Sequence, residues 1–277
     1  MTQPVGQGGR GPVERLAARD RWIVATAVAL IVLLTALYTV FGIGMTMTAL
    51  EMTRMARPIG APMQMGAPPV WTAGYALLIF LMWWVMMVAM MTPSAAPMLL
   101  LYTALKRHGP EAAHAVPFSL LFLGGYLLAW AGFSGVAAAL QWATEAAGLT
   151  NGPMMTLGSR GVAGLVLILA GLYQFSGWKA ACLRHCRSPA QFLARHSRPG
   201  GWGALRTGAH HGAYCLGCCW ALMALLFVGG IMNLYWIVGL ALFVLVEKLA
   251  PDGRRFSRLA GAALIGFGGY LVADPFV

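Results

Sequence analysis

The sequence predicts an all-α protein, a polytopic transmembrane helical bundle with about seven spans and its N-terminus inside the cell. Hydrophobic residues make up 59% of the 277 residues and charged residues only 10%, whereas a soluble domain carries about 25% charged residues. Several apolar runs reach about 20 residues, the length that a helix needs to cross a bilayer. Because these runs are continuous rather than alternating, an outer-membrane β-barrel is not expected.

Seven apolar runs define the expected spans. The first run, 22–41, is too long for the core of a signal peptide, and no small-residue cleavage site follows it. We therefore interpret it as an uncleaved anchor. In order along the chain, the spans are expected at 22–41, 70–91, 118–140, 161–178, 212–229, 231–248 and 259–273.

The fifth and sixth spans come from one uncharged run, residues 214–246. As a single helix it would measure about 50 Å, longer than a bilayer core is thick. We therefore divide it near Gly229 and Gly230 into a tight helical hairpin. At the end of the second span, Thr92 is expected to cap a new helix and Pro93 to lie in its first turn, with a kink between the two helices.

The distribution of basic residues supports an N-terminus inside. Of the 19 Lys and Arg residues, this topology leaves only Arg54, Arg57 and Arg160 outside, as the positive-inside rule requires. The net charge of +11 is therefore explained by topology, and we expect the lipid bilayer, not nucleic acid, as a partner. Residues 1–20 are expected to form a disordered cytoplasmic tail, and 21–277 a single transmembrane domain.

All five cysteines fall at the cytoplasmic ends of two successive spans. Cys182 and Cys186 share a helix face, with His185 beside them. The second group lies on the next expected helix and comprises His211, Cys215, Cys218 and Cys219. On a helix these four residues fall within an arc of about 100°. Because this side is reducing, disulfides are not expected.

Thiolates and imidazoles that converge at one depth predict a site for a soft metal ion. Cu(I) is the first expectation, zinc or iron are less favoured, and a metal-free protein is the remaining alternative. Lys179 and Arg184 are expected to favour deprotonation of the nearby thiols. The competing interpretation is that the cysteines are small buried packing residues. The Cys-x-x-Cys-Cys spacing lacks the two knuckles of a structural zinc ribbon.

Methionine, with 17 residues, is a second source of soft ligands. Met82, Met86 and Met90 follow one face of the second span, and thioethers suit Cu(I). Packing is the alternative role for such a stripe. Two further sets are a second stripe and a group in the outer loop: Met87, Met91 and Met98, and Met45, Met47, Met52, Met55, Met63 and Met65.

Several function classes are not supported by the sequence. It has no Walker motif and no large cytoplasmic domain, which excludes an ATP-driven pump. No charged residue is expected in the middle of a span, which argues against a buried carboxylate relay. No nucleophile, base and acid form a catalytic set, so an enzyme is not expected.

Three segments carry a resemblance to a known family: MMVAMMTPSAAPM at 86–98, WKAACLRHCRSP at 178–189 and HGAYCLGCCWALM at 211–223. They resemble a bacterial family of predicted metal-binding integral membrane proteins of unknown function, some of whose members are labelled copper chaperones. The resemblance covers about 71–269. It implies metal ligation by the five cysteines and a location in the bacterial inner membrane.

The leading functional hypothesis is a protein that holds or relays Cu(I), for assembly of a cuproenzyme or for copper transport. Its partners would then be a cuproenzyme or other membrane proteins. Two alternatives remain open. One is a membrane thiol redox protein that uses Cys215, Cys218 and Cys219, and the other is a structural or assembly subunit of a larger membrane complex.

Overall fold

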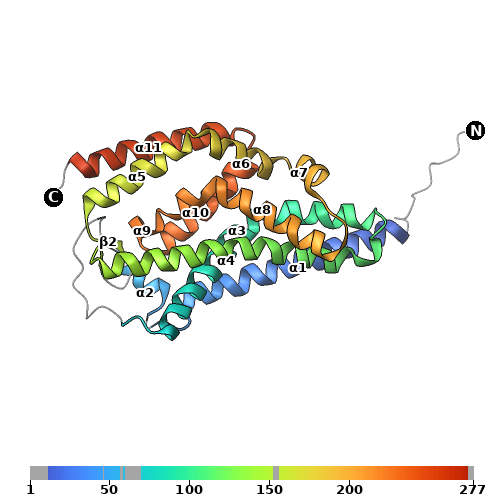
Figure 1. The fold of residues 1–277 in the computed structure, drawn as a ribbon, viewed down its shortest axis with the longest axis horizontal. Coiled ribbons are helices and arrows are strands. Elements are labelled where there is room, and N and C mark those ends of the chain that lie inside the picture. The colour runs from blue at the N-terminus through green and yellow to red at the C-terminus, as the bar shows by residue number, and fades with distance from the viewer. Residues whose placement is uncertain (1–11, 46, 57–58, 60–69, 152–155, 274–277) are drawn as a thin grey trace, which may run out of the picture.

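The computed structural model of the chain describes residues 12–45, 47–56, 59, 70–151 and 156–273. They form an elongated bundle of helices that run along one axis (Figure 1). The elements are α1 (Pro12–Phe41), α2 (Ala49–Arg54), α3 (Ala73–Arg107), a 3-10 turn (Ala112–His114), α4 (Ala115–Ala146), β1 (Thr150–Asn151), β2 (Thr156–Leu157), α5 (Arg160–Gln174), α6 (Gly177–Arg187), α7 (Pro189–His196), α8 (Gly200–Met223), α9 (Leu226–Gly229), α10 (Leu234–Leu249) and α11 (Gly253–Ala273). The predicted all-α helical bundle is confirmed, with one antiparallel pair of two-residue strands beside it.

The number of helices able to cross a membrane is lower than the expected seven. Among the described residues, five helices are long and apolar enough. A sixth span results if α5 and α6, which are bent by 62°, count as one. The difference lies in α10, because its 16 residues fall short of the about 20 that a perpendicular span needs. The helical hairpin predicted near Gly230 is present, and Gly230 adopts φ +100° between α9 and α10.

The N-terminal region and the outer loop are described only in part. Helix α1 begins at Pro12, within the range expected to be a disordered tail. Arg57, Met63 and Met65 lie outside the described residues. The α1 N-terminus, α7 and the turn between α3 and α4 lie at one end of the bundle (Figure 1). The strands, α2 and α9 lie at the other end, so the segments assigned to opposite sides of the membrane are separated in space.

The predicted start of a new helix at Thr92 is wrong, because α3 continues without interruption through Pro93 and Pro97. The Thr92 hydroxyl is buried and has no hydrogen-bond partner among the described atoms, so it does not act as an N-cap. Each proline removes one backbone donor, and a helix tolerates this loss when neighbouring helices pack around it. The helix ends at Arg107.

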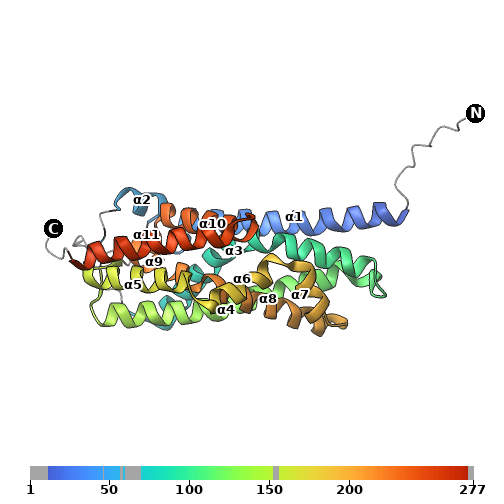
Figure 2. The ribbon, with the colours of Figure 1, turned by 90° about the horizontal axis from the view of Figure 1, so that it is seen from above.

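Glycines allow two pairs of helices to pack at close range. A Cβ atom added at Gly208 in α8 would lie 1.9 Å from the Phe122 carbonyl oxygen in α4. Between α5 and α11, a Cβ at Gly164 would lie 2.7 Å from the Gly268 carbonyl oxygen. Figure 2 shows α5 and α11 side by side. Small residues permit this approach in membrane helices, and the α4–α8 contact fixes the position of α8 along the bundle.

Ion pairs and hydrogen bonds of charged side chains connect the helices at the end of the bundle that carries α7. Arg107 forms an ion pair with Asp20 of α1, and Lys106 forms one with Glu111. The backbone amide of Gly200 donates to the same Glu111 carboxylate at 2.6 Å. The hydrogen bonds from Lys106 and Gly200 hold the pKa of Glu111 below its usual value. The ionised carboxylate therefore ties the start of α8 to the turn between α3 and α4.

Candidate metal centre

The two cysteine groups predicted to face each other do meet, across the contact between α6 and α8. Ser176 caps α6 by accepting a hydrogen bond from the Lys179 amide. At Gly217 of α8, an added Cβ would lie 2.7 Å from Cys182 Sγ, so the missing side chain lets α6 approach. Cys186 Sγ then lies 4.0 Å from Cys218 Sγ. Two ligands of one ion bound at about 2.3 Å are about 3.8 to 4.6 Å apart, and this pair falls in that range.

The three cysteines of α8 are fully buried, whereas Cys182 and Cys186 are half-buried. The thiols of Cys218 and Cys219 both donate to the Cys215 carbonyl at 3.0 Å. All five cysteines are free. The candidate centre therefore has a partly accessible side on α6 and a dry side on α8.

Methionine sulfur reaches the dry side from α3. Cys219 Sγ lies 3.9 Å from Met91 Sδ, the same spacing as the cysteine pair. The predicted stripe of Met82, Met86 and Met90 is also buried, which places these side chains inside the bundle instead of against lipid. The sulfur contact with a cysteine is made by Met91, which belongs to the second stripe.

Lys248 is a member of the centre that the sequence reasoning missed. Its ammonium nitrogen lies 3.0 Å from Cys215 Sγ and donates to Ser94 Oγ at 2.9 Å. Tyr126 adds a hydroxyl 3.2 Å from the same sulfur. An ammonium and a hydroxyl that both face one sulfur are partners suited to a thiolate. The sequence feature that could have indicated Lys248 is the pair Glu247-Lys248, which ends the uncharged run of the fifth and sixth expected spans.

Lys179 does not have the role expected from its position beside the first cysteine group. Its ammonium forms an ion pair with Glu247, at 2.7 and 3.0 Å from the two carboxylate oxygens. Both side chains are almost fully buried. Arg184 is exposed. The cation beside the thiols is therefore Lys248, because Lys179 is held by its own carboxylate partner.

The two predicted histidines are surrounded by aromatic rings. His211 is buried, and its ring centroid lies 5.7 Å from that of Tyr126. The His185 ring stacks on Tyr214 at 4.1 Å, and its Nδ1 is 2.9 Å from the Ala181 carbonyl oxygen. Within the described part of the chain, no three His, Cys, Asp or Glu side chains converge so as to hold one metal ion.

Pairs of sulfur atoms therefore define what this centre can bind. A structural zinc ion takes four ligands in a tetrahedron, and no such set is present among the described residues. Cu(I) is stable with only two or three soft ligands, and thiolate and thioether are the ligand types that select it. The two sulfur pairs, Cys186 with Cys218 and Cys219 with Met91, fit Cu(I) better than zinc.

Comparison with protein-family models identifies a related family. A family model named PpoB2 and described as a copper chaperone matches residues 80–271. Comparison with the curated proteins and with the solved structures gives no match. The matched residues include the five cysteines, Met91 and Lys248, and they exclude α1 and α2.

Proposed function

Because the chain belongs to the PpoB2 copper chaperone family, we propose that it is a multi-pass protein of the bacterial inner membrane that holds and relays Cu(I). The observation that carries this proposal is the 4.0 Å separation of Cys186 Sγ and Cys218 Sγ across two helices. The pair of Cys219 and Met91, 3.9 Å apart, supplies the next position. The recipient would be a cuproenzyme or a further carrier of copper.

Ligand exchange would move the ion between the two pairs. Cys218 and Cys219 are neighbours on α8, so an ion that moves from the first pair to the second would exchange Cys186 and Cys218 for Cys219 and Met91. Because no three cysteines converge on one point among the described residues, the Cys219 side chain would change its rotamer as Cys186 is released. Each thiol gives up one proton as it binds, and copper stays Cu(I) throughout, so no oxidant is needed. Thioether binds more weakly than thiolate, so Met91 would favour release.

Charge balance supports the same assignment. Cu(I) bound by two thiolates carries a net charge of −1, which is costly in a medium of low dielectric constant. The ammonium of Lys248, beside Cys215, supplies the compensating positive charge. A buried lysine within a group of cysteines is harder to explain if the cysteines only pack.

Copper content separates this function from the two alternatives. We expect the purified protein, reduced and loaded through a Cu(I) chelator, to retain at least one tightly bound Cu(I) per chain and to lose reactive thiols in proportion. Elemental analysis and thiol titration measure both quantities. A metal-free protein with a reducible disulfide would instead support the thiol redox protein. A metal-free protein with reduced, inert cysteines would support the structural subunit, and either result would overturn copper binding.

Membrane orientation is a separate expected result. A cytoplasmic reporter inserted at Pro199, between α7 and α8, is expected to be active, because the basic residues are concentrated on that side. A periplasmic reporter inserted at Gly148, between α4 and β1, is expected to be active as well. The opposite pattern would place the cysteines on the oxidising side and would contradict the proposed handling of Cu(I) by free thiols.

A further inference from the structure

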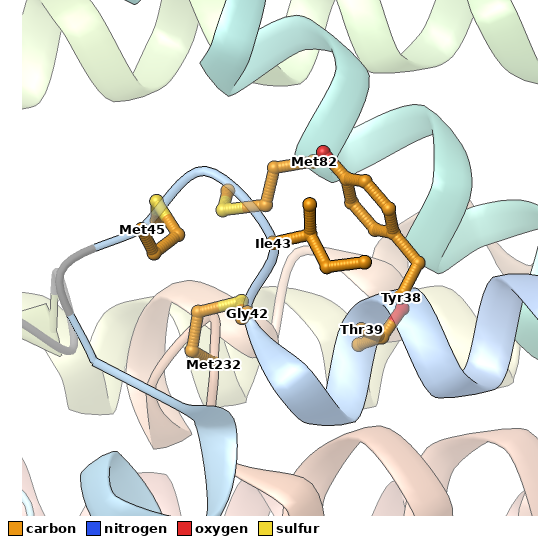
Figure 3. A pocket seen from close by; sticks show the side chains of 7 residues that line it. All are labelled: Tyr38, Thr39, Gly42, Ile43, Met45, Met82 and Met232. Carbon is orange, nitrogen blue, oxygen red and sulfur yellow. The ribbon is translucent and has the colours of Figure 1, made fainter.

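A small pocket lies at the end of the bundle that is remote from α7. Three methionines line it, and Figure 3 shows their side chains gathered around the turn that follows α1. They come from three separate segments: Met45 from the loop between α1 and α2, Met82 from α3, and Met232 from the turn between α9 and α10. The remaining lining residues are Tyr38, Thr39, Gly42 and Ile43.

The turn that carries Met45 is held in a defined conformation. Gly42 and Gly44 adopt φ +58° and +88°, values that favour glycine. The Met45 amide donates to the Gly42 carbonyl at 2.8 Å. A Cβ at Gly44 would lie 2.7 Å from the Leu78 side chain of α3, so the turn is pressed against that helix. Met45 is therefore placed over α3 by the backbone.

The turn that carries Met232 is fixed as well, and it is joined to the first. Gly230 begins it, and the Asn233 side chain caps α10 by accepting from the Tyr235 amide at 3.1 Å. The Leu234 amide donates to Thr53 Oγ1 of α2 at 2.9 Å. This bond connects the segment after Met45 to the segment after Met232, so it helps to hold the two backbone segments that carry these methionines beside each other.

The chemistry of the lining selects one class of ion. No charged side chain is among the lining residues, and the Thr39 hydroxyl already donates to the Thr35 carbonyl at 2.8 Å. Hard divalent cations need carboxylate or carbonyl oxygen, and zinc prefers thiolate and imidazole. Neutral thioethers suit Cu(I), and they bind weakly enough for the ion to leave.

We propose that Met45, Met82 and Met232 form a Cu(I) site at this end of the bundle, distinct from the cysteine centre. The choice of ion rests on the proposed function, whereas the grouping of the ligands does not. Met82 is also the first of several buried methionines on α3, and these include Met91 beside Cys219. From Met82 to Met91 the helix rises about 14 Å. The pocket and the cysteine centre are thus joined by a helix segment that is rich in buried thioethers.

Packing is the alternative role for these methionines, and the position of Met45 argues against it. A core methionine fills space within a helix interface, whereas Met45 lies on a loop and is only partly buried. The segment that follows, through α2, has three further methionines outside the pocket lining: Met47, the buried Met52 of α2, and Met55. These residues provide a matched control of the same type in the same segment.

The test uses the full chain in detergent and Ag(I), which has the same charge and ligand preference as Cu(I) and is inert to redox. We expect a variant with all five cysteines replaced by alanine to bind one Ag(I), and the further changes Met45→Leu/Met82→Leu/Met232→Leu to remove it. The control Met47→Leu/Met52→Leu/Met55→Leu should keep it. Leucine conserves volume and apolarity, so folding should survive, and a thermal unfolding scan checks this.

A second measurement needs no variant. Ag(I) should protect the partly buried Met45 of the parent chain from oxidation by hydrogen peroxide, as followed by peptide mass spectrometry, while Met47, which is also partly buried, stays unprotected. Equal oxidation with and without Ag(I) would overturn the site. If the cysteine-free variant binds no Ag(I) while the parent chain binds an ion through its thiols, this inference fails alone. If the parent chain also binds no ion through its thiols, the proposed function fails.

Discussion

Replacing both Cys186 and Cys218 with alanine is expected to remove tight Cu(I) binding from the cysteine centre, with a loss of affinity of about 1,000-fold or more, equivalent to about 4 kcal/mol. These sulfurs are 4.0 Å apart and come from different helices, so the double variant removes both ligands of the cysteine pair. The remaining close sulfur pair, Cys219 with Met91, has only one thiolate and would bind Cu(I) more weakly. Competition with a Cu(I) chelator of known affinity measures the change.

Cys182→Ser is the matched comparison, because Cys182 is on the same helix and packs against Gly217. We expect it to weaken Cu(I) binding less than tenfold, since its sulfur is not part of either close pair. Folding of both variants is checked by thermal unfolding. Parent-like affinity in the double alanine variant, or an equal loss in Cys182→Ser, would show that the ion is held by a different set of ligands.

The facing of the two cysteine groups was predictable because helical spacing determines which residues share a face. Cys182 and Cys186 are one turn apart, and the cysteines of α8 are three and four residues apart, so each group had to form one surface. Their similar depth followed from their similar distance to the predicted span ends. Metal ligation by these residues stays a prediction, because the geometry alone does not test it.

The charged partners of the centre were not predictable from local pattern. Lys248 contacts Cys215 and Lys179 pairs with Glu247, and in both cases the partners come from helices far apart in the sequence. Hydropathy marks these residues only as the polar ends of spans. Which helix ends meet depends on tilt and packing, which a single sequence does not specify.

Among the described residues, the number of helices long and apolar enough to cross a membrane is lower than expected for a similar reason. Apolar runs indicate where a chain can enter a membrane, but they do not reveal that α5 and α6 bend by 62° or that α10 ends after 16 residues. The pocket lined by Met45, Met82 and Met232 was missed in part because Met232 stands alone in an uncharged run. It becomes a ligand candidate only when the turn after α9 meets the loop after α1.

The effect of Lys248 on the centre is the second large expected result. Lys248→Leu keeps much of the volume of the side chain and removes its charge without adding a sulfur ligand. A Cu(I) ion held by two thiolates would then leave a net charge of −1 in a buried setting without its cation. We expect Cu(I) affinity to fall about 100-fold, equivalent to about 3 kcal/mol, the scale on which a broken buried pair is penalised.

Lys248→Arg separates charge from shape. It restores the positive charge with a different head group, so we expect it to recover Cu(I) affinity to within about tenfold of the parent, since a tenfold change corresponds to about 1.4 kcal/mol. Ser94→Ala removes only the neutral partner of the ammonium and should have a smaller effect than Lys248→Leu. If Lys248→Leu binds Cu(I) as tightly as the parent while remaining folded, charge compensation is not the reason for this buried lysine. Its contact with Cys215 would then matter only in the metal-free state, in which the ammonium balances the negative charge of a single thiolate.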